Sequence, residues 1–109
     1  MKRQVVLCCI FLLVPIAMGQ GYKPKAGFVP DAGTAVKIAE AVLIPVYGQP
    51  KIESERPFSA ELKDEIWTVS GTLRCPDGHG GTTTICKGGT ATVKIAKDDG
   101  RIFFMIHYK

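Results

Sequence analysis

The sequence predicts a small α+β fold, with one helix followed by an antiparallel sheet of four strands. Apolar residues first recur at helical spacing, over residues 31–46. They then alternate with polar residues in two pairs of segments, and a short polar turn joins the segments of each pair. Because one amphipathic helix and four half-apolar strands must share a core, we expect the sheet to curl its apolar face around the helix.

The helix has clear sequence signals at both ends. Asp31 can accept hydrogen bonds from the first backbone amides, which favours a helix start there. Pro45 and Gly48 favour an end at about Val46, because proline lacks the amide hydrogen and glycine commonly terminates helices. A single further helical turn is predicted around Ile52. The apolar positions at helical spacing are Ala35, Ile38, Ala39, Val42 and Leu43.

Two hairpins follow the helix. The first joins alternating segments at residues 58–62 and 67–73, and the second joins 91–95 to 102–108 through the tight turn Asp98-Asp99-Gly100. Gly71, inside the second segment, predicts a bend or bulge that lets the sheet curve. The predicted core contains the inward positions of all these elements, namely Ile38, Val42, Phe58, Leu62, Trp67, Val69, Val93, Ile95, Phe104 and Ile106.

The N-terminus has the layout of a secretory signal peptide. Lys2 and Arg3 precede an apolar run that ends in small residues, and the run is shorter than the ~20 residues a membrane span needs. We therefore expect cleavage after Gly19 and a periplasmic protein without stable membrane insertion. Residues 20–29 then form a flexible lead-in, and residues 30–109 form a single domain.

Charge and cysteine content limit the function further. Without the signal peptide the chain has 12 basic and 10 acidic residues, interspersed, which does not favour nucleic-acid binding. Cys75 and Cys86 then remain, and two cysteines in an exported chain predict a disulfide, with free thiols as the alternative. Only His79 and His107 could join them as metal ligands, so no metal or cofactor is predicted.

Three stretches carry a resemblance to a known family: PDAGTAVKIAEAVLIPVYG, KIESERPFSAELKDEIWTVSGTL and GGTATVKIAKDDGRI. They resemble the nuclear transport factor 2 (NTF2) fold immunity proteins of bacterial polymorphic toxin systems. The resemblance implies a small cystatin-like or NTF2-like cone that binds and neutralises a cognate toxin, with no catalytic motif. The chain departs from the family in its longer cysteine-bracketed loop, and in Glu65 at a turn position that commonly has a more turn-prone residue.

A binding surface is predicted on the outer face of the sheet. Ile66, Phe103 and Met105 are out of phase with the core residues, so we expect their side chains to project outward. A contiguous exposed apolar patch marks an interaction site, for the toxin or for a second copy in a homodimer. The alternative is that the lead-in, with Tyr22 and Phe28, covers this patch.

Catalysis is not predicted. His107 and Tyr108 are adjacent on a strand, so they point to opposite faces and cannot act as a simple pair. His107 is interpreted as a surface residue. His79 and Asp77 have a spacing that fits a turn hydrogen bond, and His79 is the next candidate for partner contact. Two alternatives to toxin neutralisation are a carrier of a small apolar ligand and an inhibitor of an envelope hydrolase.

Overall fold

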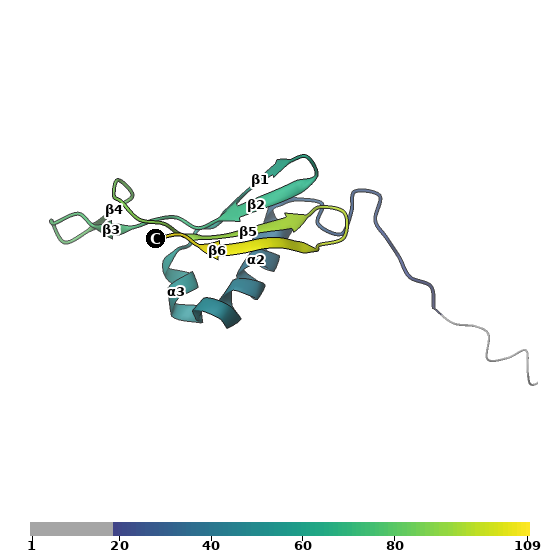
Figure 1. Ribbon diagram of the computed structural model, residues 1–109, viewed down its shortest axis with the longest axis horizontal. Coiled ribbons are helices and arrows are strands. Elements are labelled where there is room, and N and C mark those ends of the chain that lie inside the picture. The colour runs from purple at the N-terminus through teal and green to yellow at the C-terminus, as the bar shows by residue number, and fades with distance from the viewer. Residues whose placement is uncertain (1–18) are drawn as a thin grey trace, which may run out of the picture.

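The computed structural model describes residues 19–109, which form a helical layer beneath an antiparallel sheet (Figure 1). Residues 1–18, which contain all but the last residue of the predicted signal peptide, lie outside the described residues. The described elements are, in chain order, α2 (Ala32–Tyr47), α3 (Gln49–Ser54), β1 (Ser59–Lys63), β2 (Ile66–Ser70), β3 (Cys75–Pro76), β4 (Thr82–Thr83), β5 (Ala91–Ala96) and β6 (Ile102–His107).

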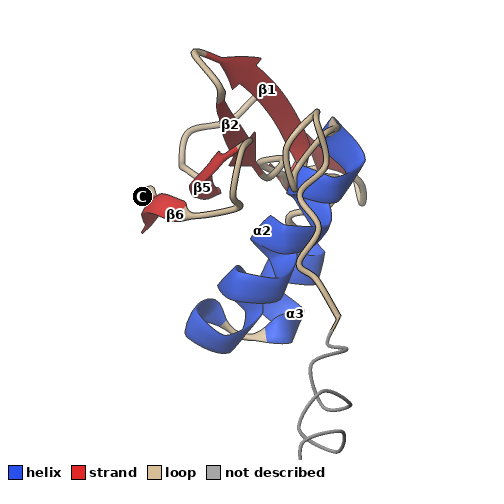
Figure 2. Cartoon of the chain, turned by 90° about the vertical axis from the view of Figure 1, so that its right-hand side faces the viewer, coloured by secondary structure: helices blue, strands red, loops and turns tan. Residues whose placement is uncertain are grey.

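The predicted α+β class and the four-stranded sheet are confirmed. The strands lie in the order β1-β2-β5-β6 and every neighbouring pair is antiparallel. Helix α2 packs against β1, β2 and β5, and the sheet curls over it (Figure 2). Strands β3 and β4 form a separate two-stranded ribbon that projects beyond the end of the sheet (Figure 1).

Helix α2 begins and ends where the sequence signals place its limits. The Thr34 amide donates to Asp31 Oδ1 at 2.8 Å, which confirms the predicted cap. Gly48 follows the last helical residue, and its amide donates to the Ile44 carbonyl. Small side chains on the buried stripe let the helix lie close to the sheet; this stripe contains Ala35, Ala39 and Leu43.

Helix α3 is the short turn predicted around Ile52. It runs directly on from α2, with Pro50 near its start, where the missing amide hydrogen costs no helical bond. Ile52 is fully buried and anchors the turn in the core.

The β1–β2 turn consists of two residues, Asp64 and Glu65, with φ of 52° and 63°. Left-handed backbone at both positions matches the right-handed twist of the flanking strands. Asp tolerates this conformation better than Glu does. The unusual Glu65 therefore occupies a strained position.

The core agrees with the prediction at the centre of the sheet and differs at its borders. Leu62 is 43% exposed although it pairs with Trp67 on the helix side, because β1 is an edge strand. Phe104 is also exposed, so both of these core predictions were wrong. Predicted core residues that are buried are Phe58, Trp67, Val69, Val93 and Ile95, while Ile38 and Val42 pack half-buried against them.

The end of the lead-in is part of the domain. Val29 is fully buried, its amide donates to the Lys97 carbonyl, and its carbonyl accepts from Trp67 Nε1 at 2.8 Å. The Phe28 amide donates to the Asp98 carbonyl. We expected a flexible segment through Val29, but backbone pairing holds its last residues against the β5–β6 turn.

Gly71 serves a close contact. A Cβ atom at this position would lie 2.9 Å from Glu55 Cβ, so only glycine allows the two residues to lie this close together. A bend or bulge was predicted at Gly71, but the irregularity of the sheet lies in the pairing of β5 with β6, where the register shifts. Within residues 19–109, helices are too short or too polar to cross a bilayer.

Candidate functional site

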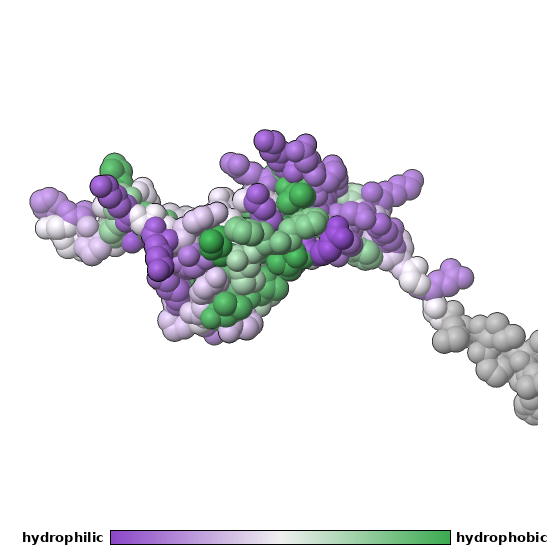
Figure 3. All heavy atoms as spheres, in the orientation of Figure 1, coloured by the Kyte–Doolittle hydropathy of each residue, from purple (hydrophilic) through white to green (hydrophobic). Residues whose placement is uncertain are grey.

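Strand β6 presents a run of exposed apolar side chains. Ile102 is 37% exposed, Phe103 48% and Phe104 41%, and all three precede the half-buried end of the strand. The Arg101 guanidinium lies over the Phe103 ring, 4.6 Å from its centroid. Figure 3 shows apolar side chains gathered over β6 and α2 on this side of the molecule. We call Arg101 and the three apolar residues the β6 patch.

A bulge in β6 changes which residues face the core. Lys94 pairs with Phe104 and Ile95 pairs with Ile102, so Phe103 is an extra residue without an opposite partner. Met105 pairs with Val93 and packs half-buried against the core. The prediction that Met105 projects outward was therefore wrong, because one inserted residue exchanges the two faces of the strand that follows it.

The same shift moves Phe104 and Ile106 to the outer face. Both residues alternate with Met105 along β6, and Phe104 lies opposite the exposed Lys94. Ile106, predicted in the core, is half-buried opposite Thr92.

Ile66 lies on the outer face of the sheet, as its alternation with Trp67 requires. It is half-buried and lines a shallow hollow of about 270 Å³ with Lys63, Thr68 and Lys94. Tyr22 of the lead-in is 80% exposed, so it does not cover this face.

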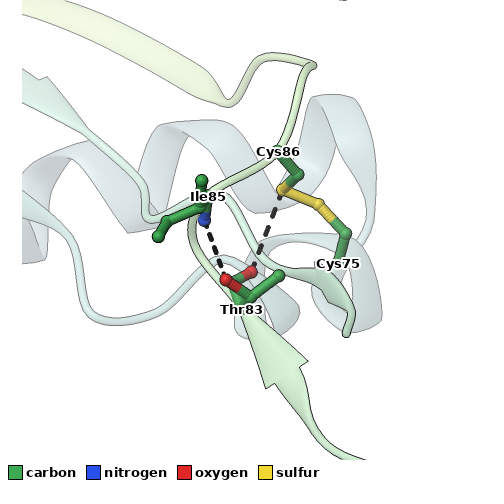
Figure 4. The surroundings of a disulfide bond; sticks show 4 residues. All are labelled: Cys75, Thr83, Ile85 and Cys86. Atoms are coloured by element: carbon green, nitrogen blue, oxygen red, sulfur yellow. Dashed lines mark hydrogen bonds between the residues drawn. A yellow bond between two sulfur atoms is a disulfide. The ribbon is translucent and has the colours of Figure 1, made fainter. Parts of the chain in front are cut away.

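Cys75 and Cys86 form the predicted disulfide, with their Cα atoms 6.5 Å apart. Near it, the Ile85 amide donates to Thr83 Oγ1 and Cys86 Sγ contacts the Thr83 carbonyl (Figure 4). Ile85 itself is 90% exposed. We call residues 75–86 the stapled loop.

His79 lies at the tip of the stapled loop. Asp77 Oδ1 accepts from the amides of His79 and Gly81, so the spacing of these residues reflects a turn. Strand β6 runs from the β5–β6 turn toward the stapled loop (Figure 1). His79 and the β6 patch therefore lie toward opposite ends of the molecule, and the structure does not bring the predicted contact residues into one site.

The most buried polar cluster was not predicted. Glu55, at the end of α3, is 6% exposed, and its Oε1 accepts from the Ala91 amide at 2.7 Å. Its Oε2 lies 2.7 Å from His107 Nε2. The His107 ring also packs at 5.5 Å from the Tyr47 ring. His107 is thus a half-buried partner of Glu55, and its interpretation as a surface residue was wrong.

Both nitrogens of His107 are engaged. Nδ1 lies 2.8 Å from the Tyr108 carbonyl, and since a carbonyl oxygen only accepts, Nδ1 carries a hydrogen. Nε2 lies against Glu55 Oε2. With both ring nitrogens engaged, His107 and Glu55 connect α3 to β5 and β6.

A cleft of about 410 Å³ opens beside Glu55, between α3 and the start of the stapled loop. Most of the residues that line it have polar side chains, among them Lys51, Thr72 and Arg74. Among residues 19–109, no three His, Cys, Asp or Glu side chains converge as metal ligands would.

Comparison with known proteins gives one family and one named relative. The sequence model of a family described as NTF2 fold immunity protein matches residues 34–109. A curated relative, "Uncharacterized protein YhhH" of Escherichia coli (strain K12), is 28% identical over 90 residues. These residues cover 83% of this chain and 65% of that protein, so the chain spans less than two thirds of the relative's length. No solved structure matches the chain.

Proposed function

Because the chain belongs to the NTF2 fold immunity protein family, we propose that it protects its cell by binding a cognate toxin and occluding it in the periplasm. Family membership supports a toxin-neutralising role in general, and the helix-and-sheet fold agrees with it. The observation that carries the binding mode is the exposed β6 patch.

The β6 patch has the chemistry of a protein-binding anchor. Binding energy at interfaces concentrates in a few large apolar, aromatic and arginine side chains. Phe103 and Phe104 supply two aromatic rings on a rigid strand, and Arg101 adds a cation already held over one of them. A toxin surface with an apolar pocket and a neighbouring carboxylate fits this combination.

A binding function also agrees with the interior of the protein. Leu43, Val69 and Val93 are fully buried and fill the space between α2 and the sheet. A carrier of a small apolar ligand would need that space, so we favour toxin binding over the carrier. Neutralisation by occlusion requires only a stable surface and no chemical step.

Export is supported by the disulfide, since such bonds persist in oxidising compartments. Mass spectrometry of the protein recovered from the periplasm should give a mature N-terminus near Gln20. A membrane-bound chain that retains Met1 would contradict the proposed location.

The test of toxin binding uses a strain that expresses the cognate toxin. We expect Phe103→Asp combined with Phe104→Asp to abolish protection while circular dichroism stays unchanged. The matched control is Ile85→Asp, which changes an equally apolar and more exposed residue on the stapled loop. It should leave protection intact.

Other outcomes are equally informative. Loss of protection in Ile85→Asp alone would move the interface to the stapled loop near His79. Trp67→Ala should abolish protection by unfolding, since truncating a buried tryptophan costs roughly 3–5 kcal/mol. If a toxin-like protein is encoded beside this chain, failure of the unaltered protein to bind it would count against neutralisation of that toxin.

A further inference from the structure

Strand β1 is an open border of the sheet. The order β1-β2-β5-β6 leaves β1 with β2 as its one neighbour in the sheet, and Figure 2 shows β1 at the border of the curl. Its five residues pair with β2 in continuous register, without a bulge. A regular edge of this kind can accept another strand, because its outward backbone groups lack partners within the sheet.

The hydrogen-bond pattern identifies those outward groups. The Gly71 amide donates to the Ala91 carbonyl, so this residue directs its backbone toward β5. Because bonding direction alternates along a strand, Trp67 and Val69 also face β5, and the residues between them face β1. Their partners in β1 are Ser59, Glu61 and Lys63. Ala60 and Leu62 therefore direct their amides and carbonyls outward from the open edge.

Two side chains of opposite charge flank Leu62 on this edge. Leu62 faces the helix side and is 43% exposed. Glu61 and Lys63, on either side of it, both point to the outer face and are exposed. Neither forms an ion pair with any residue of the described chain, 19–109.

We propose that two copies of this chain pair through β1, antiparallel, about a two-fold axis at Leu62. In this register Leu62 exchanges both backbone hydrogen bonds with the partner's Leu62, and the two side chains cover each other on the helix side. Glu61 then faces the partner's Lys63, and Lys63 faces the partner's Glu61. These are non-hydrogen-bonded pairs, in which facing side chains approach most closely.

Charge on an edge strand usually prevents pairing between molecules. Here the opposite signs flank the axis, so the same two charges favour one register and disfavour the register centred on Glu61, where like charges would meet. A two-fold interface uses one surface twice, and this edge is self-complementary in that sense.

The surroundings of β1 leave room for a second strand. An open groove of about 620 Å³ runs between β1 and α2, and its lining includes the small residues Gly33, Ser59 and Ala60. The opposite edge is less suited to self-pairing. Strand β6 has its bulge at Phe103, and antiparallel pairing centred on Met105 would place Arg101 opposite the partner's Lys109.

The dimer does not depend on the proposed toxin binding. It places the two β1 strands at the centre of a continuous sheet and the two β6 patches at its outer borders. Both patches stay accessible, so the dimer would present two equivalent toxin-binding surfaces.

Analytical ultracentrifugation of the mature, disulfide-bonded chain tests the proposal. We expect the unaltered protein to sediment as a dimer in reversible equilibrium with monomer. Glu61→Lys or Lys63→Glu alone should raise the dissociation constant about tenfold or more, because each places like charges opposite each other. The double exchange, Glu61→Lys with Lys63→Glu, should restore the dimer.

Mixing the two single variants separates repulsion from misfolding. In the mixture each strand meets its complement, so a dimer containing one chain of each variant should form even where neither variant pairs with itself. A monomer at all concentrations for the unaltered protein would overturn the proposal. Dimers that persist in both single variants would also overturn it, because the contact would then lie elsewhere.

Discussion

Glu55 and His107, 52 residues apart in the sequence, bind each other directly, with Oε2 of the carboxylate 2.7 Å from Nε2 of the ring. The other carboxylate oxygen accepts from the Ala91 amide. One buried side chain thus joins the end of the helical layer to β5 and β6. The carbonyl of Glu55 also accepts from the Thr72 amide, which fixes the chain where it leaves β2 for the stapled loop.

Removing this carboxylate should destabilise the whole domain. We expect Glu55→Ala to lower the free energy of unfolding by about 3 kcal/mol, because the Ala91 amide and His107 lose their acceptor. Glu55→Gln is the matched control. Its amide can still accept from Ala91 and donate to neutral His107, so it should cost clearly less in urea unfolding. Equal losses for both variants would contradict the importance of these two hydrogen bonds.

The β1–β2 turn offers a stabilising change. Glu65→Gly should raise the free energy of unfolding by about 0.5–1 kcal/mol, because glycine relieves left-handed strain at φ 63° and gives the favoured Asp-Gly turn. Asp64→Gly is the comparison. It should gain less, since Asp already tolerates this conformation. Thermal unfolding of both variants checks the order, and a destabilised Glu65→Gly protein would show that the Glu side chain has a role of its own.

The elements with strong local signals could be predicted from the sequence. Asp31 and Gly48 set the limits of α2 through bonds to residues within one turn. The alternation of Trp67 and Val69 with Thr68 and Ser70 set the faces of β2. The disulfide was predicted from the two cysteines that remain in a chain expected to be exported. Each of these inferences depends on neighbours in the sequence or on composition.

The candidate site depended on features that no local pattern encodes. The bulge at Phe103 inserts one residue into an otherwise regular alternation, so Met105 and Phe104 exchanged faces relative to the prediction. No sequence pattern singled out Glu55, and its partner His107 was interpreted as a surface residue. Their contact becomes visible only when α3 and β6 are placed together. Gly71, next to Glu55, was the one sequence signal of a close approach.

The cap of α2 should make stability depend on pH. The hydrogen bonds from Thr34, with the backbone one largest, lower the pKa of Asp31 below its ordinary value of 3.8. The folded state therefore favours the ionised form, and this contribution is fully present above 3.8 and is lost as the pH falls through the lowered pKa. Urea unfolding should show the unaltered protein more stable than Asp31→Asn at about pH 6, with the difference shrinking as the pH falls below 3.8. A difference that does not change with pH would contradict the charge effect.

The disulfide should stabilise the domain by less than its loop length suggests. Closing a loop of 11 residues would contribute about 3 kcal/mol if only the unfolded chain were constrained. The stapled loop projects beyond the end of the sheet (Figure 1), so the cross-link also removes freedom that the loop would otherwise keep in the folded state, and the net gain is smaller. Replacing both Cys75 and Cys86 by Ser should cost between about 1 and 3 kcal/mol and leave the far-ultraviolet dichroism of the sheet unchanged. Unfolding of the double variant at room temperature would show that the loop is required for the sheet itself.

The two residues that exchange faces in β6 provide a direct check on its register. Met105 packs against the core opposite Val93, whereas Phe104 is 41% exposed opposite Lys94. Met105→Asp would place a carboxylate against apolar side chains and should cost about 2 kcal/mol or more in urea unfolding. Phe104→Asp should cost less than about 1 kcal/mol, since its side chain is already partly in water and the new carboxylate faces a lysine. An uninterrupted alternation through β6 predicts the reverse order, so the two free energies of unfolding decide between the bulged and the regular strand. The same pair of variants separates folding from binding, because only Phe104→Asp should weaken toxin binding while the domain stays folded.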